Sequence, residues 1–230
     1  MSEIIELAGV GVTAGETPIL RDVSVRLDAR RIAVIGANGS GKSTFARLLN
    51  GLVAPSAGRV HVHGMDVARQ ARQVRERVGF VFTNPDAQIL MPTPAEDLAL
   101  SLKGSGLSRR EVAERVREEL ARHGLAAHAH QPAYSLSGGQ KQLLALVSVL
   151  IRAPRLIVAD EPTTLLDLGN ARRMADLLID GIDAQAVIAT HDLELAARCD
   201  VALRFEGGRL VEVGEPGAVI ARYRAEFAAR

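Results

Sequence analysis

A glycine-rich segment that could hold a polyphosphate lies near the start of the chain and fills every fixed position of the pattern G-x-x-x-x-G-K-[ST]. Its residues are Gly36, Ala37, Asn38, Gly39, Ser40, Gly41, Lys42, Ser43 and Thr44. Glycines allow backbone N–H groups to turn toward an anion, and the start of a following helix adds a partial positive charge. Lys42 would reach the terminal phosphates and the Ser43 hydroxyl would bind Mg²⁺. This phosphate loop therefore predicts a nucleoside triphosphate site.

Two adjacent carboxylates, Asp160 and Glu161, follow the apolar run at residues 156–159. A buried strand that ends in a carboxylate would bring Asp160 beside the phosphates, where it would hold Mg²⁺ directly or through water. Glu161 could orient or deprotonate an attacking water as a general base. Paired acidic residues at a strand end are common and usually solvated, so this interpretation depends on the phosphate loop upstream.

A third segment, Ser137, Gly138, Gly139 and Gln140, would present hydroxyl and amide donors to an anion at the start of a second helix. Together with the preceding Leu136, it resembles the signature motif of ABC-type ATPases. In that family the signature motif of one subunit closes over the γ-phosphate held by the phosphate loop of another. The resemblance therefore implies a head-to-tail dimer, with an identical or paralogous ATPase chain, and two shared ATP sites.

Two further positions match this family. Asp167, in Leu165-Leu166-Asp167, resembles the loop that crosses the dimer interface. His191, which follows the apolar run at 186–189, resembles the switch histidine that contacts the γ-phosphate and the attacking water. The resemblance thus implies Glu161 and His191 as catalytic residues, with ATP and Mg²⁺ as cofactors.

The chain departs from the family at two positions. Thr83 stands where a glutamine usually touches Mg²⁺ and the attacking water, and threonine has a shorter reach. The aromatic residue that usually stacks on adenine should fall near Thr13. Because stacking on a base is worth ~1–3 kcal/mol, its loss predicts weak discrimination between bases.

The segment after the Phe80-Val81-Phe82 run narrows the resemblance. Its residues are Thr83, Asn84, Pro85, Asp86 and Gln88. Together with Met-Pro-Thr at 91–93, this segment is similar to that of energy-coupling factor (ECF) transporter ATPases, most of all those of biotin uptake systems. The resemblance implies a groove for helices of a transmembrane coupling subunit, a separate substrate-binding membrane subunit, and a vitamin or transition-metal ion as cargo.

Other function classes remain alternatives. The ATPase of a conventional ABC importer would dock its membrane partner through a single coupling helix. A soluble ABC ATPase acting on DNA or ribosomes would carry long coiled coils or two nucleotide domains, for which 230 residues leave no room. A regulatory nucleotide binder with little hydrolysis is favoured only by Thr13 and Thr83.

Composition is typical of a cytosolic protein, and the resemblance implies one bound peripherally to the inner face of the membrane through its partner. The net charge is +1 and aromatic residues make up 3%, so no nucleic-acid partner is expected. Apolar runs are too short to span a bilayer, and the N-terminus lacks the basic and apolar regions of a signal peptide. Cys199 is the single cysteine, which excludes an internal disulfide.

The predicted fold is α/β, an ABC nucleotide-binding domain over residues 1–230. It combines a P-loop NTPase core with a RecA-like parallel sheet, an N-terminal antiparallel β subdomain and an inserted α-helical subdomain. The β subdomain and core would span 1–83 and 153–230, and the helical signature subdomain 84–152. Ser108 and Glu111 predict a capping box at a helix start inside this insertion.

Two histidine pairs could suggest a metal site, His61 with His63 and His128 with His130. Zinc sites use three or four protein ligands, and neither pair has a third candidate close by in the sequence. We therefore expect no metal role for these histidines.

Overall fold

The computed structural model describes residues 3–228, so the first two and last two residues of the predicted domain lie outside the described residues. An antiparallel sheet occupies the N-terminal part, in the order β2-β1-β4-β5. Its strands are β1 (Ile5–Ala14), β2 (Thr17–Leu27), β4 (Ala57–Val62) and β5 (Met65–Asp66). The predicted antiparallel β-rich start of the chain is confirmed.

A second sheet has six strands in the order β10-β9-β3-β8-β7-β6. They are β3 (Arg31–Ile35), β6 (Val78–Val81), β7 (Leu156–Asp160), β8 (Gln185–Ala189), β9 (Val201–Glu206) and β10 (Arg209–Gly214). Neighbouring strands are parallel from β9 to β6, and every residue of β3, β7 and β8 is buried. The predicted parallel sheet is thus confirmed for five strands, while β10 pairs antiparallel because the tight Gly207-Gly208 turn forms a hairpin.

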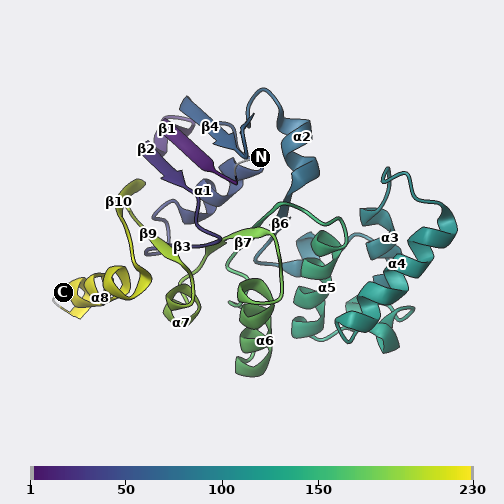
Figure 1. The fold of residues 1–230 in the computed structure, drawn as a ribbon. Coiled ribbons are helices and arrows are strands. Elements are labelled where there is room, and N and C mark those ends of the chain that lie inside the picture. The colour runs from purple at the N-terminus through teal and green to yellow at the C-terminus, as the bar shows by residue number, and fades with distance from the viewer. Residues whose placement is uncertain (1–2, 229–230) are drawn as a thin grey trace.

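Helices cover this sheet and form an arm at one side of it (Figure 1). The α-helices are α1 (Lys42–Leu49), α2 (Ala71–Arg77), α3 (Pro94–Ser101), α4 (Arg109–Arg122), α5 (Gly138–Leu150), α6 (Leu168–Ile179), α7 (Leu193–Ala197) and α8 (Pro216–Ala228). Single 3₁₀ turns are η1 (Pro85–Ala87), η2 (Ala126–His128) and η3 (Ala133–Ser135). Within residues 3–228, none of these helices combines the length and apolarity that crossing a bilayer requires.

The helical arm, residues 84–152, contains α3, α4 and α5. The capping box predicted at its Ser108 is present, with Glu111 bonding back to the backbone of that residue. A separate hydrophobic cluster holds the arm together, built around Leu98, Leu120 and Leu144. The arm therefore has its own core.

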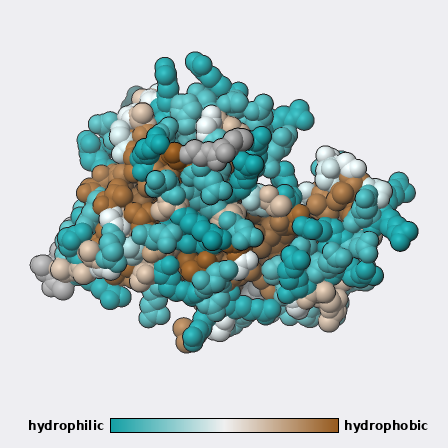
Figure 2. Space-filling view, in the orientation of Figure 1, coloured by the Kyte–Doolittle hydropathy of each residue, from teal (hydrophilic) through white to brown (hydrophobic). Residues whose placement is uncertain are grey.

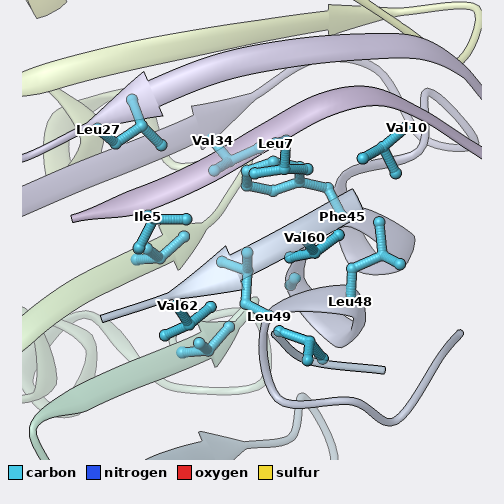
Figure 3. Close-up of a cluster of buried hydrophobic side chains, with 14 of the residues drawn as sticks. Ile5, Leu7, Val10, Leu27, Val34, Phe45, Leu48, Leu49, Val60 and Val62 are labelled. Atoms are coloured by element: carbon cyan, nitrogen blue, oxygen red, sulfur yellow. The ribbon is translucent and has the colours of Figure 1, made fainter. Parts of the chain in front are cut away.

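Helix α1 lies between the two sheets, and Figure 3 shows its buried face pointing among their strands. Phe45, Leu48 and Leu49 are fully buried there, against residues such as Leu7 of β1 and Val34 of β3. Burying side chains of this size contributes ~1.5–3 kcal/mol each. Both sheets therefore fix the start of α1, where the phosphate loop ends.

Candidate functional site

The phosphate loop, Gly36–Thr44, is shaped by backbone angles that suit glycine. Gly36, Gly39 and Gly41 have φ values of 146°, 77° and 104°. A Cβ at Gly36 would lie 2.2 Å from the carbonyl oxygen of Phe205, so no other residue fits that position without backbone movement. The structure thus gives a physical reason for the glycine that opens the loop.

The ammonium of Lys42 lies inside this loop. Its Nζ donates to the carbonyl oxygens of Gly36 and Ala37, at 2.7 and 3.1 Å. Burial lowers the pKa of Lys42, while the nearby carboxylates of Glu161 and Asp160 act in the opposite direction. A cation held at low exposure beside backbone N–H groups is suited to a polyphosphate.

Asp160, the last residue of β7, faces the start of α1. The Ser43 hydroxyl donates to Asp160 Oδ1 at 2.8 Å, and an Arg47 guanidinium nitrogen lies 3.6 Å from Oδ2. Burial raises the pKa of Asp160, and the Ser43 hydrogen bond opposes that shift. Sequence reasoning missed Arg47, although its position one helical turn after Ser43 was a usable signal.

Glu161 and His191 meet at the carboxyl ends of β7 and β8. Glu161 Oε2 lies 2.7 Å from His191 Nδ1 and also accepts from Thr164 Oγ1 at 3.1 Å. Its other carboxylate oxygen lies 3.9 Å from Lys42 Nζ. Glu161 has a φ of 53°, a strained value for a residue with a side chain, and its N–H donates to the Ala189 carbonyl. The edge where ligands of parallel sheets bind thus gathers the predicted catalytic pair.

The signature segment, Ser137–Gln140, forms the first turn of α5. Ser137 is the N-cap: its Oγ accepts from Gln140 N at 3.3 Å, and Gln140 Oε1 accepts from Ser137 N at 2.8 Å. Ser137 and Gly138 are exposed to solvent. This capping box leaves a hydroxyl and backbone N–H groups at an accessible helix start.

Asn170 contacts both Asp167 and the signature segment, so it connects the two. Asp167 caps α6 by accepting from Asn170 N at 2.9 Å and from Asn170 Nδ2 at 2.6 Å. A Cβ at Gly139 would lie 2.4 Å from Asn170 Cγ, so the two segments are in close contact. Sequence reasoning missed Asn170, and a search for capping partners of Asp167 would have found it.

Thr83 is hydrogen-bonded to the neighbouring strand. Its Oγ1 donates to the carbonyl oxygen of Asp160 at 2.8 Å. The backbone of Phe82, just before it, is held at both polar groups: its N–H donates to Gln88 Oε1, and its carbonyl accepts from Gln142 Nε2. Thr83 is therefore linked to the backbone of the predicted Mg²⁺ ligand.

The segment after Thr83 makes the 3₁₀ turn η1. Asn84 caps it by accepting from Asp86 N, with Pro85 at the first position of the turn. Asp86 pairs with Lys141 Nζ at 2.8 Å, and Gln88 Nε2 donates to the Ala145 carbonyl at 2.7 Å. The predicted coupling segment is thus attached to α5, the helix that begins with the signature segment.

Thr13, at the position predicted for an adenine-stacking aromatic, bonds instead to a neighbouring turn. Its N–H and Oγ1 each lie 3.0 Å from Ser56 Oγ. Weak discrimination between bases stays a prediction, which a titration comparing ATP with GTP would measure.

A phosphate loop that enters a helix, a carboxylate pair at the end of another strand of the same parallel sheet, and a capped Ser-Gly-Gly-Gln segment on a helical arm together define an ABC-type ATPase domain. A family model described as "ABC transporter" matches residues 20–164. The chain belongs to the ABC transporter ATP-binding family, and it is an ATP hydrolase. The predicted family, fold class and enzyme class are confirmed.

Several curated relatives match almost the whole chain. A putative ABC transporter ATP-binding protein of Deinococcus radiodurans is 47% identical, over 96% of this chain and 97% of that protein. A biotin transport ATP-binding protein, BioM, of Rhizobium etli is 46% identical over the same shares. An energy-coupling factor transporter ATP-binding protein, EcfA1, of Lacticaseibacillus paracasei is 35% identical, over 95% of this chain and 81% of that protein. The predicted resemblance to ECF and biotin-system ATPases is therefore confirmed.

Two solved structures share the fold. One is cbiO1 of Clostridium perfringens, described as part of the ABC transporter complex cbiONQ, with a TM-score of 0.86 and 27% identity over 98% of this chain and 93% of that chain. The other is a dimeric ATP-binding cassette in a post-hydrolysis state with ADP and Pi. Its TM-score is 0.81 and its identity 26%, over 92% of this chain and 98% of that chain.

Proposed function

We propose that this chain is the ATP-hydrolysing subunit that energises an ECF-type importer, with biotin as the favoured cargo and another vitamin or a transition-metal ion as the alternatives. The observation that carries the proposal is the 46% identity to the R. etli biotin transport ATP-binding protein along nearly the full length of both chains. The chain would work at the cytoplasmic face of the membrane, beside a transmembrane coupling subunit and a substrate-binding membrane subunit.

Hydrolysis is assigned to the Glu161–His191 pair. The Glu161 carboxylate takes a proton from the attacking water, whose oxygen bonds to the γ-phosphorus while the bond to the β–γ bridging oxygen breaks, giving ADP and phosphate. The 2.7 Å contact from His191 Nδ1 and the bond from Thr164 support this role, because they orient the carboxylate. Lys42 offsets negative charge on the terminal phosphates.

The residues present fit a magnesium ion. The Ser43 hydroxyl and the Asp160 carboxylate approach within 2.8 Å of each other, and both are hard oxygen donors of the kind that Mg²⁺ prefers. When bound there, the ion would neutralise phosphate charge. Asp160 also fixes Ser43, so the two ligands are held in place together.

A second ATPase subunit, identical or paralogous, would complete each ATP site through its Ser137–Gln140 segment. Leu165 and Leu168 flank Asp167 and are 64% and 88% exposed, an apolar surface suited to contact with another chain. The dimeric cassette that shares this fold supports the arrangement. Each ATP would then be held between the phosphate loop of one subunit and the signature segment of the other.

A membrane coupling subunit would dock in the groove between α2 and the helical arm. The groove has a volume of about 270 Å³ and is lined by residues of α2, β6, α3 and α5, including Glu76, Phe80 and Leu100. In Figure 2 apolar residues gather along the arm, beneath the notch that separates it from the lobe carrying α2. Leu90, 72% exposed, lies at this groove, and Gln88 connects it to the backbone beside Thr83. A helix moving in the groove would therefore act close to Asp160.

Copurification and transport test the proposal. We expect the chain to copurify with a membrane coupling subunit and a substrate-binding subunit, and vesicles holding the complex to accumulate biotin only with internal ATP and Mg²⁺. Leu90→Arg should abolish copurification, whereas Val211→Arg, at an exposed position of β10 on the opposite edge of the sheet from β6, should keep it. Copurification with a conventional importer's membrane subunits, or uptake without ATP, would contradict the assignment.

A further inference from the structure

His128, the last residue of η2, makes side-chain hydrogen bonds on both ring nitrogens. Its Nε2 lies 2.9 Å from Gln140 Nε2, in the signature segment, and its Nδ1 lies 2.9 Å from Gln131 Oε1. The neighbouring His130 is exposed. His128 and His130 formed one of the two histidine pairs for which the sequence offered no support as a metal site. The structure shows that His128 contacts Gln140 of the signature segment.

Donor chemistry fixes the direction of each bond in this chain. Ser137 N–H can only donate, so the Gln140 side chain must present its oxygen to Ser137 and its NH₂ to His128. An amide NH₂ can only donate, so His128 Nε2 must be an unprotonated acceptor. A neutral imidazole with a bare Nε2 carries its proton on Nδ1, which then donates to Gln131 Oε1.

We propose that His128 is a positioning residue for ATP hydrolysis, holding the signature segment through Gln140 as the neutral Nδ1–H form. The inference rests on the proposed role of Ser137–Gln140 toward the ATP of a second subunit. Without the acceptor at Nε2, the Gln140 side chain loses one of its two anchors, and Ser137 N–H loses an oriented partner. The phosphate loop takes no part in the hydrogen bonds that link Gln131, His128, Gln140 and Ser137.

Two substitutions of His128 test the role of the Nε2 acceptor apart from that of the remaining side chain. In His128→Gln an amide oxygen can reach the place of Nε2, whereas in His128→Asn the shorter side chain reaches only the place of Nδ1. Loss of one hydrogen bond, worth ~1 kcal/mol, should lower kcat about fivefold in His128→Asn. We expect His128→Gln to stay within roughly twofold of the original chain, as the conservative exchange keeps the bond. The matched control, His130→Asn, should not change kcat.

ATP affinity of the isolated chain, measured with a fluorescent ATP analogue, should be the same in all these variants, because ATP binds first at the phosphate loop. An unchanged kcat in His128→Asn, or an equal loss in His128→Gln, would overturn the positioning role. Nitrogen NMR of the imidazole ring gives a direct test of the tautomer: a signal from protonated Nδ1 and bare Nε2 is expected, and protonation at Nε2 would overturn the bond directions.

Gly139→Arg distinguishes failure of this inference from failure of the proposed site. This variant blocks the signature segment itself and should abolish hydrolysis. If Gly139→Arg hydrolyses ATP normally, the signature assignment is wrong and the role of His128 falls with it. If Gly139→Arg is inactive while His128→Asn is fully active, only the inference about His128 is wrong.

Discussion

The two proposed halves of the ATP site on this chain are built in opposite ways. The phosphate-loop half joins residues that are far apart in the sequence, such as Gly36 against Phe205, Ser43 with Asp160, and Glu161 with His191. The signature half is held mostly by near neighbours, through the capping box at 137–140 and the helix cap at 167–170. One half is thus a product of the whole sheet, and the other of short local segments.

This difference matters for how the site can work. The phosphate loop enters α1, which both sheets clamp, while the signature segment opens α5, which helps to form the separate core of the helical arm. Contacts within locally built segments survive when the segment moves as a body. The internal bonds of the proposed signature half therefore do not depend on the sheet that carries the phosphate loop.

The largest expected effect is a loss of ATP hydrolysis when the general base of the phosphate-loop half is removed. Glu161→Gln removes the general base while keeping the size of the side chain, so hydrolysis should fall at least roughly 10²-fold. ATP binding should persist and an ATP-bound dimer should accumulate in size-exclusion chromatography. Glu194→Gln, at an exposed position of α7, is the control. Normal turnover in Glu161→Gln would remove the catalytic assignment.

The next prediction compares the two halves through their glycines. Gly36→Ala places a Cβ 2.2 Å from a backbone oxygen, whereas Gly139→Ala meets the Asn170 side chain, which can rotate away. We expect urea unfolding to show a loss of about 3 kcal/mol or more for Gly36→Ala and about 1 kcal/mol for Gly139→Ala.

Gly39→Ala is a matched control for the backbone angle alone. Gly39 shares a positive φ with Gly36, but a Cβ there has nothing within 4 Å. Its cost should be about 1–2 kcal/mol, the usual strain of that conformation. Equal losses for Gly36→Ala and Gly139→Ala would mean that the two halves are equally rigid.

Much of this site could be predicted from the sequence. The phosphate loop, the carboxylate pair and the signature segment each occupy consecutive residues, so their local chemistry is visible without the fold. The strand ends that carry the phosphate loop, the carboxylate pair and His191 meet because parallel strands share one carboxyl edge, which the apolar runs already indicated.

The residues that were missed act through tertiary contacts or through side-chain direction. Arg47 and Asn170 had local signals, a helical turn after Ser43 and the cap at Asp167. Their contacts with Asp160 and Gly139, like that of Gln142 with Phe82, join elements whose packing the sequence does not specify. His128 contacts Gln140 because η2 returns toward the start of α5, a path set by the arm's core. The antiparallel β10 was foreseeable as a hairpin, yet its place at the edge of a parallel sheet depends on packing.

Asp160, in the phosphate-loop half, and Asp167, in the signature half, have pKa values shifted in opposite directions. Replacing each by asparagine should therefore change the stability of the fold in opposite directions, which compares the two halves. Burial raises the pKa of Asp160, so the folded state is penalised for its charge at neutral pH; stability falls as pH rises through that raised value. Hydrogen bonds from Asn170 lower the pKa of Asp167, so its charge stabilises the fold above the ordinary carboxyl range, and this is lost at lower pH. Without Mg²⁺ and nucleotide, Asp160→Asn should raise the midpoint of thermal unfolding at pH 7, and Asp167→Asn should lower it.

Each kcal/mol is worth ~2–4 °C for a chain of this size. As pH falls, the Asp160 difference should shrink first, between the raised pKa of the folded state and the ordinary carboxyl value of about 4, whereas the Asp167 difference should shrink only below about pH 4. A destabilised Asp160→Asn at pH 7 would mean that the bonds to Ser43 and Arg47 outweigh the burial of the charge.

The smallest expected effect is on the rate at which the buried thiol of Cys199 is labelled, which measures how often the surrounding core opens. Burial raises the pKa of this thiol to about 12, so iodoacetamide at pH 8 should label the native protein far more slowly than the unfolded chain. Cys199 belongs to the cluster behind β3 and β8, which α5 also enters through Leu146. Gly139→Ala should therefore leave labelling within about twofold of the original rate if the signature half opens separately. Faster labelling in Gly139→Ala, as strong as in Gly36→Ala, would mean that α5 carries disturbances from one half-site into the core of the other.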